Sequence, residues 1–338
     1  MNNVLQEDLK KLASTFIFKE ELKNKTVLIT GATGLIGSTT IYFLELLNKK
    51  YDLNINIIGI ARNKEKVESY KYSKSIFILY QDIETPIALD CSVDYIIHTA
   101  CPTQSAYFTD HPVEVIKTSV NGSINIFELA KKKKSSVIFL SSIEVYGQIL
   151  DSKPLIENEY GNIDFLKTRS SYPESKRIVE CLAFSYVNEY GVDIKIARLT
   201  QTIGPSISVT DNRVFAQFAK AIIFSNDIVL FTEGTSAKSY IYTIDALNAF
   251  FYMLFRGEKG EAYNIANEKT YISIKNLAIF LIENFNPNIH VDIQKKELGY
   301  YPPESKINLD TTKLKSLGWL PLYNLKEMFQ RLIKSLSE

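Results

Sequence analysis

Cysteine, histidine and tryptophan are scarce in this sequence, whose 338 residues include three cysteines, three histidines and one tryptophan. Cys91, Cys101 and Cys181 are too few and too scattered for a disulfide framework. The histidines and cysteines also form no cluster with the spacing of a metal site. We therefore expect free thiols and no bound metal.

The sequence also lacks an excess of charge and a long hydrophobic run. Its 39 Lys and Arg residues against 38 Asp and Glu offer no broad cationic surface for nucleic acid or anionic lipid. No apolar run reaches the roughly 20 residues that cross a bilayer. The N-terminus lacks the basic-then-apolar order of a secretion signal. We expect a cytoplasmic protein that binds neither nucleic acid nor membrane.

Short β-rich segments alternate with helical segments along much of the chain, and 46% of the residues are apolar, enough for a substantial core. This alternation is typical of a parallel sheet whose strands are joined by crossover helices. It predicts an α/β fold with a Rossmann-type doubly wound parallel sheet. The predicted strands are residues 26–30, 56–60, 76–79, 93–98, 136–140 and 193–197.

Three regions follow from the pattern. Residues 1–24 have the periodicity of one amphipathic helix and form an N-terminal extension that we expect to pack on the body. Residues 25–204 form the expected NAD(P)-binding domain. After Gly204-Pro205 the elements become shorter and more mixed, so residues 205–338 form mainly a smaller substrate-binding lobe. This boundary need not be a single cut, because a strand such as residues 262–265 could pair with the large sheet.

A glycine turn lies between the first strand and the first long helix of the body. Gly31, Gly34 and Gly37 have the Gly-x-x-Gly-x-x-Gly spacing that permits a tight turn, close approach to a pyrophosphate and helix–strand packing. A glycine triplet alone is weak evidence, but this one follows an apolar strand and opens a helix. We expect the phosphates at that helix N-terminus. The predicted contacts of the turn are Gly31, Thr33, Gly34, Leu35, Ile36 and Gly37.

The end of the second strand bears on the cofactor. An acidic residue there would bind the ribose 2′-hydroxyl of NAD, but Ala61 and Arg62 stand in its place. Arg62 suits a 2′-phosphate, which favours NADP(H) over NAD(H); the alternative is a solvated arginine beside bound NAD. Asp82, after the third strand, suits the adenine amino group, although a turn aspartate explains it as well. We count the adjacent Ile83 among the cofactor contacts.

Ser142, Tyr172 and Lys176 form the predicted catalytic set. Tyr172 and Lys176 are one helical turn apart and share a face. We expect the lysine to lower the pKa of the phenol and to hold the nicotinamide ribose, while Tyr172 exchanges a proton with a substrate hydroxyl. Ser142 ends a strand and would orient the same oxygen. A Tyr-x-x-x-Lys pair arises by chance in a chain with 20 tyrosines, but the order of turn, serine and pair is specific.

With these features the chain resembles the extended short-chain dehydrogenase/reductases, the NAD(P)-dependent epimerase and dehydratase family that acts on nucleotide-activated sugars. The resemblance covers most of residues 25–335, and within the family it is greatest to UDP-glucuronate decarboxylases. It implies a nucleotide-diphosphate sugar as substrate, oxidation at the sugar C4, cofactor contacts from Thr99 and Ala100, and a homodimer formed through the helix of Tyr172. The motifs that carry it are 31–37, 98–102, 121–122, 141–147, 169–177, 198–205, 211–213 and 240–245.

Several residues depart from the family pattern. Sugar 4,6-dehydratases of this family carry Thr-Asp-Glu before Val-Tyr-Gly, whereas this chain has Ser142-Ile143-Glu144. Ile143 cannot donate a proton, which argues against ordinary 4,6-dehydration. Glu144 is our candidate for a second acid/base, or else a carboxylate that orients a neighbour.

The expected substrate contacts also differ from the pattern. Gln201 stands where the family usually has Asn, and Lys238 where it usually has Arg. A lysine lacks the bidentate fork of arginine, which argues against decarboxylation too. Arg213 is a candidate phosphate contact, although a surface arginine at a helix start is the alternative.

The residues and the resemblance together predict an NADP(H)-preferring nucleotide-sugar epimerase or oxidoreductase that works through hydride transfer at C4. A nucleotide-sugar decarboxylase and a 4,6-dehydratase are the alternatives within the family. A cofactor-binding sensor without activity is the alternative of another class.

Overall fold

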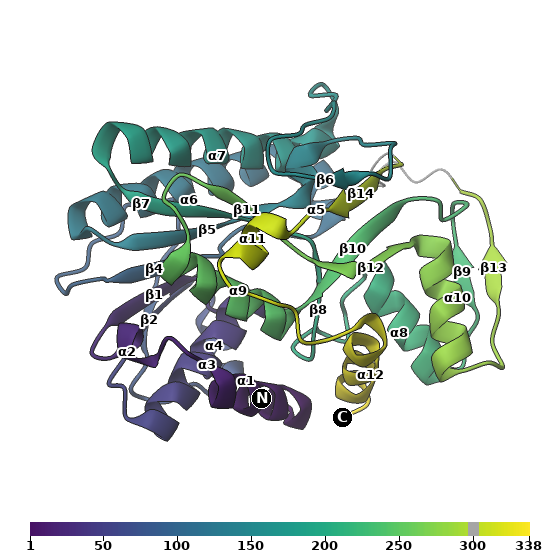
Figure 1. The fold of residues 1–338 in the computed structure, drawn as a ribbon, viewed down its shortest axis with the longest axis horizontal. Helices are drawn as coiled ribbons and strands as arrows, with labels where there is room; N and C mark the ends of the chain where they lie inside the picture. The colour runs from purple at the N-terminus through teal and green to yellow at the C-terminus, as the bar shows by residue number, and fades with distance from the viewer. Residues whose placement is uncertain (297–303) are drawn as a thin grey trace.

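A seven-stranded sheet forms the centre of the computed structural model, which describes residues 1–296 and 304–338 (Figure 1). The strand order is β11-β7-β5-β4-β1-β2-β3, and every neighbouring pair is parallel. The predicted fold class is thus confirmed. The bounds are β1 Thr26–Thr30, β2 Asn56–Ala61, β3 Phe77–Tyr80, β4 Tyr95–His98, β5 Ser136–Ser142, β7 Asp193–Leu199 and β11 Ala262–Ile265.

Helices cover both faces of this sheet. On one face α3 (Leu35–Tyr51) packs on β1 and β2, and α9 (Thr243–Arg256) packs on β5 and β7. On the other face α6 (Pro112–Lys133) and α7 (Ser171–Tyr190) lie side by side against β4, β5 and β7 (Figure 1). Because both faces are covered, β1 is buried along its whole length, which fits the apolar run at its centre, residues 27–29.

A second sheet supports the smaller lobe. Its order is β12-β10-β14-β6, and β8 pairs with β10. β6 and β8 come from the part of the chain before residue 205, while β11 and α9 come from after it and join the large sheet, so the chain crosses repeatedly between the two sheets. The bounds are β6 Pro154–Leu155, β8 Gln201–Ile203, β10 Ala237–Tyr242, β12 Asn267–Ser273 and β14 Lys306–Leu309.

Shorter elements complete the two lobes. β9 and β13 form a two-stranded ribbon at the outer edge of the smaller lobe. None of the described helices is both long and apolar enough to cross a membrane. The remaining bounds are α4 Lys64–Tyr70, α5 Ser105–Asp110, η1 Ile143–Tyr146, η2 Thr168–Ser170, α8 Val214–Phe224, β9 Ile228–Leu230, α10 Ile274–Phe285, β13 Val291–Ile293, α11 Thr312–Ser316 and α12 Leu325–Leu336, where η marks a 3-10 helix.

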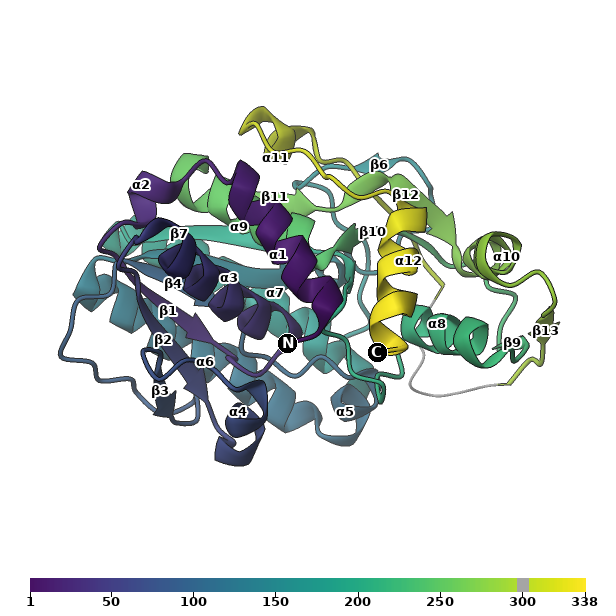
Figure 2. The ribbon, with the colours of Figure 1, turned by 90° about the horizontal axis from the view of Figure 1, so that it is seen from below.

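The N-terminal extension differs from the single helix expected for residues 1–24. It comprises α1 (Asn3–Thr15) and α2 (Lys19–Leu22), with an extended C-cap at Phe16. Phe16 and Phe18 are both buried, and Phe16 packs edge-on against aromatic rings of α3 and α9. In one continuous helix, positions two apart would point in different directions, so burial of both rings favours the break. α1 lies beside α12 at the C-terminus (Figure 2).

Candidate active site

The glycine turn joins β1 to α3 at the carboxyl edge of the large sheet, where the strand order reverses between β1 and β4. Gly31 has a φ of +66°, and a Cβ on Gly37 would lie 2.2 Å from the carbonyl oxygen of Gly31. Gly34, the N-cap of α3, has no side chain to occupy the first-turn N–H groups. This geometry fits the pyrophosphate of a dinucleotide at the helix N-terminus, which is where open α/β sheets bind ligands.

Thr30 ties the turn to the end of β4. Its Oγ1 accepts from the backbone N–H groups of Thr99 and Ala100, both at 3.0 Å, and lies 2.8 Å from His98 Nδ1. The other ring nitrogen of His98 lies 3.1 Å from Ser123 Oγ. Burial, and then the charge of Lys176, lower the pKa of His98 to about 3. His98 is therefore a neutral, hydrogen-bonded core residue that borders both the turn and the lysine.

Two tyrosines that the sequence analysis did not single out hold the outer side of the turn. Tyr70 donates from its hydroxyl to the carbonyl oxygen of Thr33 at 2.7 Å, and Tyr72 donates to that of Ala32 at 2.6 Å. The two rings are stacked, with centroids 5.5 Å apart. Because both acceptors are backbone atoms of the turn, these contacts restrain the conformation of the cofactor-binding loop.

The predicted adenine-side residues contact each other. Arg62 Nη1 lies 3.5 Å from Asp82 Oδ2, and their side chains are 68% and 40% exposed. Ile83 behaves differently, because its side chain is buried beneath helix α6 against Gly122, and Asn125 donates to its carbonyl oxygen. The exposed pair is free to rearrange around a ligand, whereas the Ile83 side chain is part of the core.

The structure brings Ser142, Tyr172 and Lys176 together at the end of β5 and the start of α7. Ser142 Oγ accepts from the backbone N–H of Glu144 at 3.2 Å, and this side chain lowers the pKa of the Tyr172 phenol. Lys176 donates from Nζ to the carbonyl oxygen of Leu140 at 2.8 Å, and Nζ lies 5.8 Å from the centre of the Tyr172 ring. The chain thus supplies a hydroxyl, a phenol and an ammonium group in one place.

The pKa of Tyr172 is raised, whereas a net lowering by Lys176 was expected. Burial is the largest influence and raises the pKa of Tyr172 above its ordinary value, and the electrostatic interactions with Cys101 and Glu144 raise it further. The hydrogen bond from Ser142 and the charge of Arg169 lower it, but they do not outweigh burial. Tyr172 is therefore a neutral phenol at pH 7 in this structure, ready to donate a proton.

Glu144 belongs to a charged group of three residues that reaches into the smaller lobe. Arg169 Nη2 donates to Glu144 Oε1 at 2.8 Å, and the side chains are 11% and 33% exposed. Lys238 of β10 completes the group: burial lowers its pKa, the charge of Glu144 raises it and the charge of Arg169 lowers it. The charges of Glu144 and Arg169 therefore act on both Tyr172 and Lys238.

Gln201 and Arg213 lie in the second lobe, and their predicted contacts with substrate stay predictions. Gln201 pairs with Tyr240 in the β8–β10 ladder. Arg213 caps α8 and is held by Asp211, whose carboxylate accepts from its Nε at 3.0 and 3.1 Å and from Nη2 at 2.6 Å. An anionic ligand would have to compete with Asp211 for this guanidinium.

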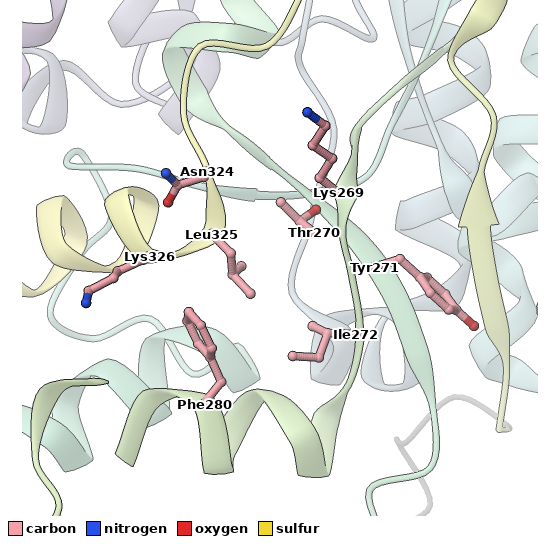
Figure 3. Close-up of a pocket in the computed structure, with 8 residues that line it drawn as sticks. All are labelled: Lys269, Thr270, Tyr271, Ile272, Phe280, Asn324, Leu325 and Lys326. Atoms are coloured by element: carbon pink, nitrogen blue, oxygen red, sulfur yellow. The ribbon is translucent and has the colours of Figure 1, made fainter. Parts of the chain in front are cut away.

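A cavity of about 350 Å³ lies in the smaller lobe, and none of these residues lines it (Figure 3). It is bordered by β12, by Phe280 of α10 and by the start of α12. In Figure 3 the amine groups of Lys269 and Lys326 point away from each other. The cavity shares no lining residue with the predicted site, so the convergence of Ser142, Tyr172 and Lys176 identifies the active site better than cavity size.

Arg169 and Phe108 are the main members of the site that sequence reasoning did not assign a role. Phe108 of α5 stacks on the Tyr172 ring with centroids 4.2 Å apart and planes 6° apart. Arg169 stands in the same short motif as Tyr172, and that proximity was a signal for it. Phe108 offered no such signal, because its contact depends on how α5 packs against α7.

Comparison with known proteins shows the family of this chain and agrees with its fold. The sequence model of the NAD dependent epimerase/dehydratase family matches residues 27–266. UDP-glucuronic acid decarboxylase 5 of Arabidopsis thaliana is 30% identical over 306 residues, which cover 90% of this chain and 87% of that protein. The chain therefore belongs to the NAD dependent epimerase/dehydratase family of enzymes, which use a nicotinamide dinucleotide, and the resemblance seen in its motifs is confirmed.

Solved structures show the same fold. A UDP-glucose 4-epimerase from Thermotoga maritima superposes with a TM-score of 0.77 at 22% identity, covering 92% of this chain and 98% of that one. A dTDP-glucose 4,6-dehydratase from Streptomyces venezuelae, solved with NAD bound, gives a TM-score of 0.77 at 20% identity, with coverage of 92% and 97%. At these identities the likeness is one of fold.

Proposed function

We propose that this protein acts on a nucleotide-diphosphate sugar, as an epimerase or oxidoreductase that works through hydride transfer at the sugar C4. The observation that carries the proposal is the convergence of Ser142, Tyr172 and Lys176 beside His98 and Thr30, which border the glycine turn. A bound nicotinamide would supply the hydride chemistry. The protein would supply proton transfer and orientation at the same carbon.

Each member of the set has a distinct role in this proposal. As a phenolate, Tyr172 would take the proton of the C4 hydroxyl during oxidation, and as the phenol it would return that proton during reduction. Ser142 donates a hydrogen bond to the same oxygen and orients it. Lys176, anchored on the carbonyl of Leu140, binds the nicotinamide ribose and adds positive charge beside the phenol. Glu144 serves as the auxiliary acid/base.

Decarboxylation of a nucleotide-activated uronic acid is the second candidate. It is supported by Glu144, whose surroundings include the basic side chains of Arg169 and Lys238, which suit an anionic sugar. The sequence similarity to UDP-glucuronic acid decarboxylases points the same way. The guanidinium of Arg169 can supply the bidentate hydrogen bonding to a carboxylate that the Lys238 amine lacks.

Dehydration of the sugar and a sensor role have less support. Ile143 is buried and apolar at the position where the dehydratases carry an acid, so elimination of water would need another proton donor. A complete set of Ser142, Tyr172 and Lys176 would serve no purpose in a sensor that only binds the cofactor.

The same proposal includes NADP(H) as the preferred cofactor. Arg62 is 68% exposed, and its ion pair with Asp82 is long at 3.5 Å. Exposed pairs of this kind contribute little, so Arg62 is able to turn toward a 2′-phosphate at small cost. We further propose a cytoplasmic homodimer that pairs through α6 and α7.

A turnover assay tests the proposal. UDP-, dTDP-, GDP- and CDP-sugars, including uronic acids, are each incubated with NAD(H) or NADP(H), and product mass and nicotinamide absorbance are followed together. An inverted stereocentre at constant mass identifies an epimerase, and a mass change matched to cofactor consumption identifies a reductase or dehydrogenase. Loss of carbon dioxide would instead establish the second candidate. Absence of turnover across the panel, with dinucleotide bound, would refute the proposal.

A further inference from the structure

Arg169 occupies an unusual position between the two candidate acid/base residues. It belongs to η2, the 3-10 helix that leads directly into α7. Its Nη2 donates to Glu144 Oε1 at 2.8 Å. Its guanidinium also lies over the Phe108 ring, 4.8 Å from the ring centre, and the Phe108 ring stacks on the Tyr172 ring with centroids 4.2 Å apart. One side chain thus reaches Glu144 directly and Tyr172 through Phe108.

Stability gives little reason for a guanidinium at this place. The Arg169 side chain is only 11% exposed, and within the described residues its Nε is buried without a hydrogen-bond partner. Burying a charge with part of its hydrogen-bonding capacity unused is costly, and an apolar residue often does as well in such a position. The position of the charge, next to Glu144 and near Tyr172, offers a better explanation.

We infer that Arg169 is a positioning residue that holds the Glu144 carboxylate in one orientation and opposes the effect of its negative charge on the Tyr172 phenol. This inference rests on the role of Tyr172 in the proposed function. Arg169 itself need not touch the substrate. Its hydrogen bond fixes the carboxylate, and its cation–π contact with Phe108 supports the ring on which Tyr172 is stacked.

The charges around Tyr172 agree with this role. Glu144 raises the pKa of Tyr172, whereas Arg169 lowers it, so the two residues act in opposite directions on the same phenol. They also act in opposite directions on the pKa of Lys238. The titratable or charged groups that border this cluster are Cys101 after β4, Glu144 on η1, Arg169 on η2, Lys176 on α7 and Lys238 on β10.

The test measures the phenol directly in the full-length protein. 3,5-Difluorotyrosine is incorporated at position 172, and its ¹⁹F resonance is followed against pH without any substrate. Arg169→Gln should raise the titration midpoint by about 1 pH unit, because the nearby cation is lost. Glu144→Gln should lower the midpoint, and the double variant should lie between the two. Arg169→Lys keeps the positive charge, so its midpoint should lie close to that of the protein with Arg169.

Arg177→Gln is the matched control. Arg177 lies on α7 and is partly buried, but it donates to the carbonyl oxygens of Val145 and Gly161, at 2.8 and 2.9 Å. This variant should leave the midpoint unchanged. A folded Arg169→Gln protein with an unchanged or lowered midpoint would overturn the inference, and so would an equal shift in the control. If Arg169→Gln does not fold, Glu144→Gln decides. An unchanged midpoint in that variant would show that the charge of Glu144 has no effect on Tyr172, and the inference would then fail.

The ¹⁹F titration needs no turnover, so its outcome is independent of the sugar panel. A silent panel with a shifted midpoint would refute the proposed function and keep the role of Arg169. With an active sugar, the pH profile of kcat/KM should move up in Arg169→Gln by the same amount as the midpoint. If Arg169 were purely structural, its substitution would instead lower the rate equally at every pH.

Discussion

Burial dominates the chemistry of the individual residues in this site. Tyr172 lies beneath Phe108 and is largely shielded from water, so its pKa is raised despite the neighbouring lysine. His98 is buried in the same region, and its pKa is lowered. Both shifts favour the neutral form, as desolvation always does. A bound ligand that adds positive charge near Tyr172 would move its pKa in the direction that proton abstraction requires.

Tyr172→Phe should remove the proton-transfer group without disturbing the fold. The phenylalanine keeps the ring that stacks on Phe108 and loses only the hydroxyl. We expect kcat to fall by roughly 10²- to 10⁴-fold, with dinucleotide affinity unchanged. Steady-state kinetics and isothermal titration calorimetry measure the two quantities. Tyr190→Phe, at the exposed end of the same helix, is the control, and full activity of Tyr172→Phe would contradict the assignment.

Arg62→Ala tests the cofactor preference. The exposed guanidinium is a suitable partner for a 2′-phosphate, and its loss should weaken NADP(H) binding by roughly tenfold. NAD(H) has no such phosphate, so its affinity should change little and serves as the internal control. Fluorescence titration with both dinucleotides gives the ratio. Equal losses for the two would rule out a phosphate contact.

Among the elements, helix α1 is joined to the C-terminal half through one buried carboxylate. Asp8 is 1% exposed and accepts from the hydroxyls of Tyr242 at 2.6 Å and Tyr323 at 2.9 Å. It also pairs with Arg331 of α12 at 2.6 Å. Because the three partners come from β10, α12 and the segment before α12, the N-terminal extension braces the smaller lobe.

Asp8→Ala should therefore destabilise the protein well beyond the loss of one surface contact. It leaves two buried hydroxyls and the Arg331 guanidinium without their acceptor, which we expect to cost about 3 kcal/mol. Urea unfolding followed by circular dichroism measures the change in the free energy of unfolding. Glu7→Ala is the control, since Glu7 contacts Arg331 from an exposed position. Equal stability of the two variants would show that α1 is not a brace.

At the scale of the whole molecule, the outer surface of α6 and α7 is the proposed dimer interface. Val113 and Ile116 on α6 are 56% and 44% exposed, and Ile178 and Phe184 on α7 are 52% and 56% exposed. The two helices lie side by side, so two copies would form a four-helix contact around a twofold axis. Exposed apolar residues gathered on adjacent helices are typical of such an interface.

Ile178→Glu should weaken this dimer. A carboxylate buried in the proposed contact would be desolvated without a partner, which should reduce the association constant by at least roughly tenfold. Analytical ultracentrifugation over a range of protein concentrations gives that constant. Phe224→Glu, an equally drastic change on the exposed surface of α8, should have no effect. A protein that sediments as a monomer before any substitution would refute the interface itself.

The sequence by itself determined the positions of the strands of the large sheet, the glycine turn and the family. β1 and β11 have the bounds read from the sequence, because apolar runs and turn glycines are local properties. The family motifs identified Ser142, Tyr172 and Lys176 for a similar reason, since their spacing is visible in one dimension.

Only the tertiary structure decided what surrounds those residues. The break between α1 and α2, the stacking of Phe108 on Tyr172 and the pairing of Arg169 with Glu144 all depend on distances between separate elements. The ion pair between Arg62 and Asp82 depends on such a distance as well. The direction of the Tyr172 pKa shift belongs here as well, because desolvation is set by how closely neighbouring elements pack, which one-dimensional spacing does not encode.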